Sequence, residues 1–189
     1  MAMATLPHDD VKCPLINALH FRRGIQNMRV GDFEVEIPIP AESVGSTKRD
    51  WTLVQRAWWG GIAAVYVDVK NVSARIALEM RVTADSGVIM APQRGNTLGT
   101  ASIKVITNMP AVEDKNGIWL EFKQTLAEIW TGYKGPDGEK LNVRPHWAKE
   151  WEETKVEGRD WVAHMKDVSY KGEIYVFKQV LGEIGQKQG

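Results

Sequence analysis

Apolar and acidic side chains alternate in the stretch Phe33-Glu34-Val35-Glu36-Ile37-Pro38-Ile39-Pro40 until prolines interrupt the pattern. Successive side chains of a β-strand point to opposite faces, so this pattern predicts a half-buried strand from Phe33 to Ile39. Pro38 and Pro40 cannot donate a backbone hydrogen bond, which suggests that the strand lies at an edge of its sheet.

The segment that follows has a longer period. From about Arg49 to Val69 apolar residues recur at three- and four-residue steps, which predicts a helix that Ser46 or Thr47 can cap. Within it the uncharged run Ala57–Val67 is too short to span a bilayer, so we expect a buried helix. Close packing is the expected reason for its paired glycines, Gly60-Gly61.

The rest of the chain mixes strands and helices without regular alternation, which favours an α+β fold with an antiparallel sheet covered by helices. Residues 1–29 show no sustained periodicity and are interpreted as an irregular lead-in to one domain at residues 30–189. The further predicted elements are strands at Arg75–Thr83 and Ala101–Thr107, a polar loop at Pro110–Asn116, a helix from Asn116 or Gly117 to Trp130, and short helices at Glu157–Met165 and Lys171–Leu181.

The composition argues against several classes of protein. The chain has 24 basic and 24 acidic residues, so no charge imbalance points to nucleic acid or an anionic membrane. A single cysteine, Cys13, excludes an internal disulfide framework and fits a reducing, intracellular compartment. No stretch reads as a signal peptide or a transmembrane segment.

A second informative stretch is Arg144-Pro145-His146-Trp147-Ala148-Lys149. The proline fixes the backbone just before a histidine, an indole and a lysine, so the stretch predicts a rigid loop that presents side chains of different chemistry. The residues alone allow a second interpretation, an ordered turn with one aromatic anchor and solvated charges.

Three segments of the chain resemble segments of a known family and follow one another in the same order as they do there. His146-Trp147-Ala148-Lys149 is similar to the signature of the sugar-1,4-lactone oxidases, closest to the D-arabinono-1,4-lactone oxidases of the vanillyl-alcohol oxidase flavoprotein superfamily. Ala77–Val82 resembles their strand with a Glu-x-Arg pair, and Phe33–Pro40 resembles the segment that leads into their substrate domain. The resemblance runs from about Val30 to near the C-terminus.

The resemblance implies FAD-dependent oxidation of an aldose or lactone at a C–OH group, with oxygen as the acceptor. Enzymes of this family hold FAD in a separate N-terminal domain, yet this sequence has no Gly-x-Gly-x-x-Gly phosphate loop. We therefore expect the chain to be the substrate (cap) domain only, incomplete and inactive without a flavin domain supplied in trans. A mitochondrial or membrane-associated location is also implied by the resemblance.

The resemblance also assigns roles to particular residues. Lys149 would be the cation beside the flavin, with Trp147 against its ring, and His146 would contact the substrate hydroxyl or act as general base. Glu79 and Arg81 would bind and orient the substrate. From the residues alone, the default interpretation of Glu79 and Arg81 is an exposed ion pair, and the alternative for His146 is a structural imidazole that holds its loop.

The spacing of these residues gives geometric expectations. Because Glu79 and Arg81 lie two apart, they share a face of their strand, which we expect to be a central strand facing His146. His146 and Lys149 are expected at the mouth of an open concavity. No histidine has paired ligand spacing, so no metal site is predicted. The alternative functions are a non-enzymatic sugar-binding module and a repurposed cap domain with cofactor-free acid–base chemistry.

Overall fold

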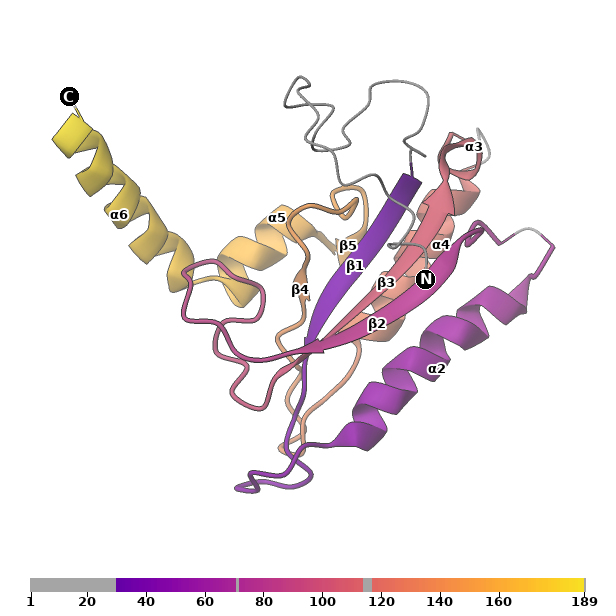
Figure 1. The fold of residues 1–189 in the computed structure, drawn as a ribbon, viewed down its shortest axis with the longest axis horizontal. Coiled ribbons are helices and arrows are strands. Elements are labelled where there is room, and N and C mark those ends of the chain that lie inside the picture. Colours follow the sequence, from indigo (N-terminus) through magenta and orange to yellow (C-terminus); the bar gives the residue numbers. More distant parts are fainter. Residues whose placement is uncertain (1–29, 71, 114–116, 189) are drawn as a thin grey trace, which may run out of the picture.

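A computed structural model describes residues 30–70, 72–113 and 117–188 (Figure 1). The predicted lead-in at residues 1–29, and Cys13 with it, lies outside the described residues. The described part is an α+β fold in which helices pack on an antiparallel sheet, as the sequence predicts.

The sheet has four strands in the order β2-β3-β1-β4, and each strand pairs antiparallel with its neighbour (Figure 1). The long strands β1 and β3 pair over their whole length, with Val30 opposite Asn108 and Pro38 opposite Thr100. The strands are β1 (Val30–Pro38), β2 (Ala77–Thr83), β3 (Thr100–Asn108) and β4 (Arg144–Pro145).

Two predictions of strand position are wrong. Strand β1 lies inside the sheet between β3 and β4, although its prolines suggested an edge, and β2 is an edge strand of the described sheet and not a central one. Proline is tolerated in β1 because Pro38 is its last residue, where a missing N–H group ends the ladder and does not interrupt it.

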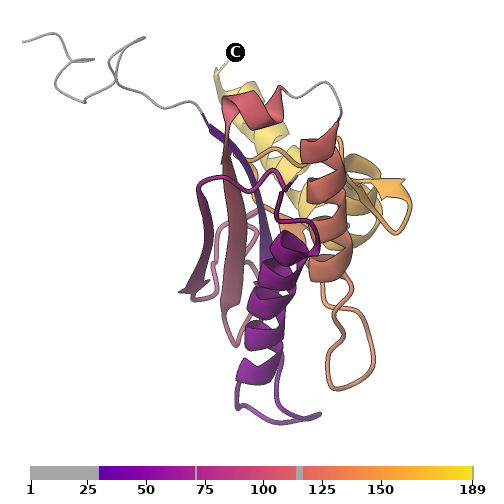
Figure 2. The same ribbon diagram turned by 90° about the vertical axis from the view of Figure 1, so that its right-hand side faces the viewer.

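Two helices, α2 (Trp51–Val67) and α4 (Ile118–Thr131), cover one face of the sheet (Figure 2). The odd-numbered residues of β1 point into this layer, and Phe33 stacks on Trp130 with ring centroids 5.9 Å apart. Both rings are fully buried. The apolar half of the alternation therefore builds the core.

The uncharged run Ala57–Val67 suggested a buried helix, but one side of α2 is exposed to solvent. Trp59 and Val67 are 63% and 84% exposed. The helix buries one side, which includes Gly61. A Cβ atom added to Gly61 would lie 3.1 Å from the Trp130 ring, and one added to Gly60 would lie 3.0 Å from Ile129. Close packing against α4 thus confirms the reason predicted for the two glycines.

The cap predicted for α2 is also wrong. Asp50 caps the helix, because its Oδ1 accepts hydrogen bonds from the backbone N–H groups of Thr52 and Leu53. A bridge between Ala41 and Arg49 closes a loop over the intervening residues, so the helix cannot begin near Ser46 or Thr47.

The C-terminal part contains short elements and one long helix. Helix α6 is longer than predicted and projects from the body of the domain in Figure 1. The first residues of the predicted polar loop belong to helix α3 (Met109–Val112). Gly117, just before α4, has a positive φ of 72°. No helix in the described ranges is long and apolar enough to cross a membrane. The remaining elements are β5 (Lys155–Val156), β6 (Arg159–Asp160), α5 (Trp161–His164), the π-helix η2 (Met165–Ser169) and α6 (Glu173–Gln188).

His164 makes the stability of this region sensitive to acid. Its side chain is buried against Trp161, its Nδ1 has no hydrogen-bond partner among the described residues, and burial lowers its pKa. Because the unfolded chain then binds the proton more readily, the free energy of unfolding should fall as the pH drops below about 6.5. His164→Leu should flatten this decline, as measured by thermal unfolding between neutral and acidic pH. An unchanged pH dependence in the variant would contradict this assignment.

Candidate functional site

The face of the sheet opposite α2 and α4 carries charged and polar side chains from β1, β2 and β3 and from His146, the residue after β4. Glu34 of β1 lies opposite Lys104 of β3, which in turn lies opposite Glu79 of β2. On the other side of β1, the backbone N–H of His146 donates to the Glu34 carbonyl at 3.1 Å. Together we term these residues the polar sheet face: Glu34, Glu36, Glu79, Arg81, Ser102, Lys104 and His146.

Ion pairs and hydrogen bonds link the strands across this face, and the Arg81–Glu34 pair reaches from β2 across β3 to β1. An Arg81 guanidinium nitrogen lies 2.9 Å from Glu34 Oε1, and Lys104 Nζ lies 3.0 Å from Glu79 Oε2. The Ser102 hydroxyl donates to Glu36 Oε2. The Arg81 side chain is 58% exposed and that of Glu34 only 1%. Arg81 therefore presents part of its guanidinium to solvent while it neutralises a buried carboxylate.

Glu34 and Glu36 are the two buried carboxylates of the face. Burial raises the pKa of Glu36, and the negative charge of Glu34 raises it further, whereas the Ser102 hydroxyl, His146 and Gln93 act in the opposite direction. Oε2 of Glu34 is buried without a hydrogen-bond partner among the described residues. The face thus contains a carboxyl group that retains its proton more readily than usual, a property of acid–base groups in active sites.

His146 lies beside these carboxylates. One nitrogen of His146 and one carboxylate oxygen each of Glu34 and Glu36 all lie within 4.8 Å of one another. The imidazole is half-buried, and its Nδ1 accepts a 3.3 Å hydrogen bond from the Ala148 N–H. Two carboxylates and an imidazole at this spacing can exchange a proton or hold a cation. The sequence argument against a metal site depended on the spacing of the histidines along the chain and missed this group.

Glu79 and Arg81 share the face with His146, but the structure does not bring all three into contact. Only Arg81 reaches the centre of the face, through its ion pair with Glu34. Glu79 lies on the edge strand, half-exposed, with three interstrand steps of about 4.8 Å between its backbone and that of His146. Any ligand that contacts both would therefore have to extend across the sheet.

Lys149 and Trp147 follow His146 at the margin of the face. Lys149 Nζ lies 2.6 Å from Asp32 Oδ2, so an anion of the same chain already compensates its charge. The indole N–H of Trp147 donates to the Met90 carbonyl at 2.7 Å, and its ring packs on Tyr170 with centroids 5.3 Å apart. His146 and Lys149 are both partly exposed, so neither lies in a closed apolar pocket.

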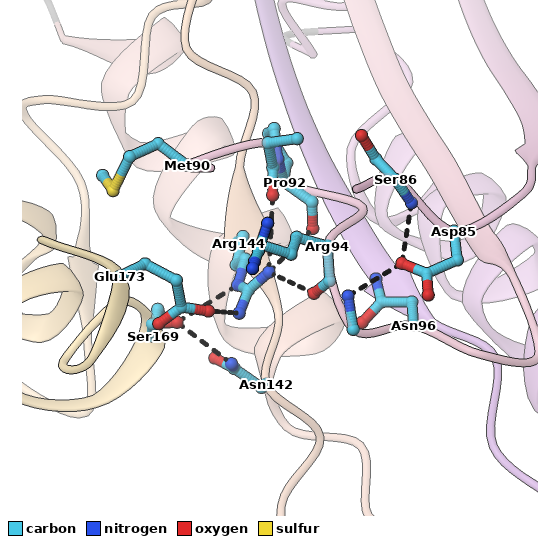
Figure 3. Close-up of polar contacts among 12 residues, drawn as sticks. Asp85, Ser86, Met90, Pro92, Arg94, Asn96, Asn142, Arg144, Ser169 and Glu173 are labelled. Carbon is cyan, nitrogen blue, oxygen red and sulfur yellow. Dashed lines mark hydrogen bonds and ion pairs between the residues drawn. The ribbon is translucent and has the colours of Figure 1, made fainter. Parts of the chain in front are cut away.

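Arg144, the first residue of β4, is a buried structural anchor (Figure 3). It donates to the carbonyl of Arg94 at 2.6 Å and to that of Ser169 at 3.2 Å, and it pairs with Glu173 at 3.1 Å. Its guanidinium also lies 4.5 Å from the centre of the Tyr170 ring. Arg144 thereby ties β4 to the β2–β3 loop and to the start of α6, which holds the loop carrying His146.

Sequence reasoning missed Glu34, Glu36 and Ser102. Alternation with apolar residues predicts that the two acidic residues lie on the polar face of the strand, and such a face is usually solvated. Two features of the sequence could have identified them. Their strand has apolar residues of high β-propensity on its other face, and another predicted strand carries a group of opposite charge, Arg81.

The two residues predicted to lie beside a flavin have partners in the same chain, since Lys149 pairs with Asp32 and Trp147 packs on Tyr170. Among the described residues, the glycines considered for a pyrophosphate cradle have other roles. Gly60 and Gly61 pack inside α2 against α4, and Gly95 and Gly99 have positive φ angles at the ends of turns. Comparisons with known protein families, with curated proteins and with solved structures found no match.

Proposed function

We propose that the domain binds the substrate of an oxidase similar to the sugar-1,4-lactone oxidases, and that the polar sheet face receives the sugar or aldonolactone. One observation supports this proposal above the others. The three segments on which the resemblance rests, residues 33–40, 77–82 and 144–149, are far apart in sequence but contribute to one four-stranded sheet.

The groups on this face suit a polyol. Arg81 donates in a fork and Glu79 accepts from hydroxyl groups, so the two can fix the orientation of a sugar ring or chain. A C–OH group that is oxidised must lose a proton as well as a hydride. His146, with Glu36 beside it, is the group we assign to take that proton.

The hydride acceptor in this proposal is FAD, which supplies the redox chemistry when bound. Trp147 and Lys149 are the residues assigned to its ring end. Because Asp32 pairs with Lys149, the lysine is held in position but its charge is partly offset. The phosphate end has to be held by residues other than those described.

A second candidate is a sugar-binding module without redox chemistry. The Lys149–Asp32 pair favours it, because a lysine that stabilises a reduced flavin would be expected to direct its charge at the cofactor. The two candidates share the ligand and the face, and differ only in whether the ligand is oxidised.

Turnover separates the two candidates. With an aldose such as D-arabinose and added FAD, the chain alone should form no peroxide, whereas addition of a flavin-binding domain from a lactone oxidase should give turnover. Absence of peroxide in every combination, from protein that still binds the sugar, would favour the binding module. Turnover by the chain alone would show that it holds FAD by itself.

Two variants should then lower the reconstituted activity by different routes. Lys149→Met removes the cation beside the flavin and should slow flavin reduction at saturating substrate by about 10²-fold. Glu79→Ala removes a hydrogen bond to the substrate and should raise KM about tenfold. Stopped-flow reduction and steady-state peroxide assays measure these effects, and a change in KM alone for Lys149→Met would contradict its assignment.

A further inference from the structure

The two buried carboxylates and the imidazole of the polar sheet face form a group that the proposed oxidase function does not require as a set. Glu34 and Glu36 lie two apart on the same face of β1, and His146 lies opposite Glu34 across the β1–β4 pair. One donor atom from each of the three side chains lies within 4.8 Å of the other two. No hydrogen bond joins any two of these side chains in the described part of the chain.

Glu34 gives a second, independent indication of a ligand. Its side chain is fully buried, and Arg81 occupies only Oε1. Oε2 has no hydrogen-bond partner among the described residues. A buried carboxylate oxygen without a partner is rare, because its desolvation costs about 1–3 kcal/mol or more, and an ion or an ordered water usually satisfies it.

We propose that Glu34, Glu36 and His146 bind one divalent transition-metal ion on the polar sheet face, a function beyond the proposed sugar oxidation. Two carboxylate oxygens and one imidazole nitrogen are a mixed donor set that suits Zn²⁺, Mn²⁺ or Co²⁺ better than Ca²⁺, which takes oxygen ligands only. Three protein ligands leave coordination positions for water or for substrate oxygens, as in catalytic sites.

The neighbouring groups would form the outer shell of this site. Arg81 holds Glu34 through Oε1, so Glu34 can coordinate through Oε2, and the Ser102 hydroxyl and the Gln93 side chain hold Glu36. Arg81 also offsets one of the two negative charges, which would lower the affinity relative to an unpaired site. His146 can coordinate through Nδ1, or through Nε2 in the neutral tautomer that carries its proton on Nδ1, and in both cases the 3.3 Å hydrogen bond from the Ala148 N–H to Nδ1 would be given up.

The test uses the full chain after dialysis against a chelator, with Zn²⁺ and Co²⁺ as probes and no flavin or sugar present. Calorimetry with Zn²⁺ should show saturable binding of about one ion per chain, with release of protons. Co²⁺ should give the visible d–d absorption of a nitrogen–oxygen site. Because neither measurement involves oxidation, failure of the metal proposal leaves the proposed function standing, and the reverse also holds.

Isosteric variants identify the ligands. Glu34→Gln, Glu36→Gln and His146→Gln should each weaken Zn²⁺ binding by more than about tenfold, since even loss of an outer-shell partner costs 10–100-fold. Glu79→Gln is the matched control, because it removes the same charge from the same face outside the group of three, and it should bind as the wild type does. Circular dichroism and the unfolding midpoint establish that each variant is folded.

Two results would overturn the proposal. One is the absence of saturable Zn²⁺ and Co²⁺ binding by the folded wild-type chain, which would assign Glu34 Oε2 to an ordered water. The other is equal binding by wild type and His146→Gln, which would show that the ion binds elsewhere. Should every ligand variant prove unfolded, Mn²⁺ added to the wild-type chain must broaden the ring signals of His146 before those of the other described histidine, His164, and failure to do so would also refute the site.

Discussion

Arg144→Met is expected to lower the free energy of unfolding by about 3–5 kcal/mol, because it removes one partner of a buried hydrogen-bonded ion pair. The methionine retains an apolar stem but removes the donor to the Arg94 carbonyl and to the Glu173 carboxylate, and it leaves the Ser169 carbonyl with Asn142 as its remaining donor. The loss should appear as a lower urea midpoint with an unchanged slope. Hydrogen exchange should also increase in the β2–β3 loop, which Arg144 ties to β4.

Arg159→Met is the matched control for Arg144→Met. Arg159 and Asp167 are both exposed, and their ion pair spans 3.9 Å, so we expect a change within about 0.5 kcal/mol. Equal effects of the two substitutions would contradict the role of Arg144 as an anchor.

Trp130→Ala is expected to destabilise the fold by about 3–5 kcal/mol through a cavity between the sheet and both covering helices. The indole is fully buried, stacks on Phe33, and donates from its N–H to the Ala57 carbonyl of α2 at 3.1 Å. Gly61 lies next to the Trp130 ring and has no side chain that could fill the space left by the substitution. Urea unfolding followed by circular dichroism measures the change.

Trp59→Ala provides the comparison for Trp130→Ala on the same pair of helices. Trp59 lies on the outer side of α2 and is mostly exposed, so its loss should change the free energy of unfolding by about 0.5 kcal/mol or less. A loss at Trp59 as large as that at Trp130 would mean that the outer side of α2 is covered in solution.

Local patterns predicted the elements of the sheet well. Alternation in residues 33–39 and 75–83 identified β1 and β2 and assigned Phe33 to the core face, because side-chain direction in a strand depends only on sequence parity. The helix at residues 118–131 was predicted nearly to its ends, because its apolar residues recur at the spacing of a helix face.

Features that depend on distant residues were not predictable in the same way. Whether β1 is an edge or an inner strand depends on its pairing with β3 and β4, which no local pattern encodes. The cap of α2 moved to Asp50 because Ala41 pairs with Arg49. Both errors arise from tertiary pairing that overrides a local preference.

The candidate site shows the same division. The sequence proposed Arg81 and His146 as site residues, and both lie on the polar sheet face. It did not identify Glu34 and Glu36 as site residues, because their burial and partners come from β2, β3 and the loop after β4. An acidic residue in an alternating strand is usually solvated, and only the assembled sheet distinguishes the exception.

Nuclear magnetic resonance titration of the chain shows directly whether the polar sheet face binds a sugar-type ligand. With D-arabinono-1,4-lactone in chelator-treated buffer, we expect saturable shifts at Arg81, Ser102 and His146, and a Kd about tenfold weaker for Arg81→Lys, which keeps the charge but loses the guanidinium fork. Shifts confined to other surfaces, or saturable binding that Arg81→Lys leaves unchanged, would contradict binding at this face.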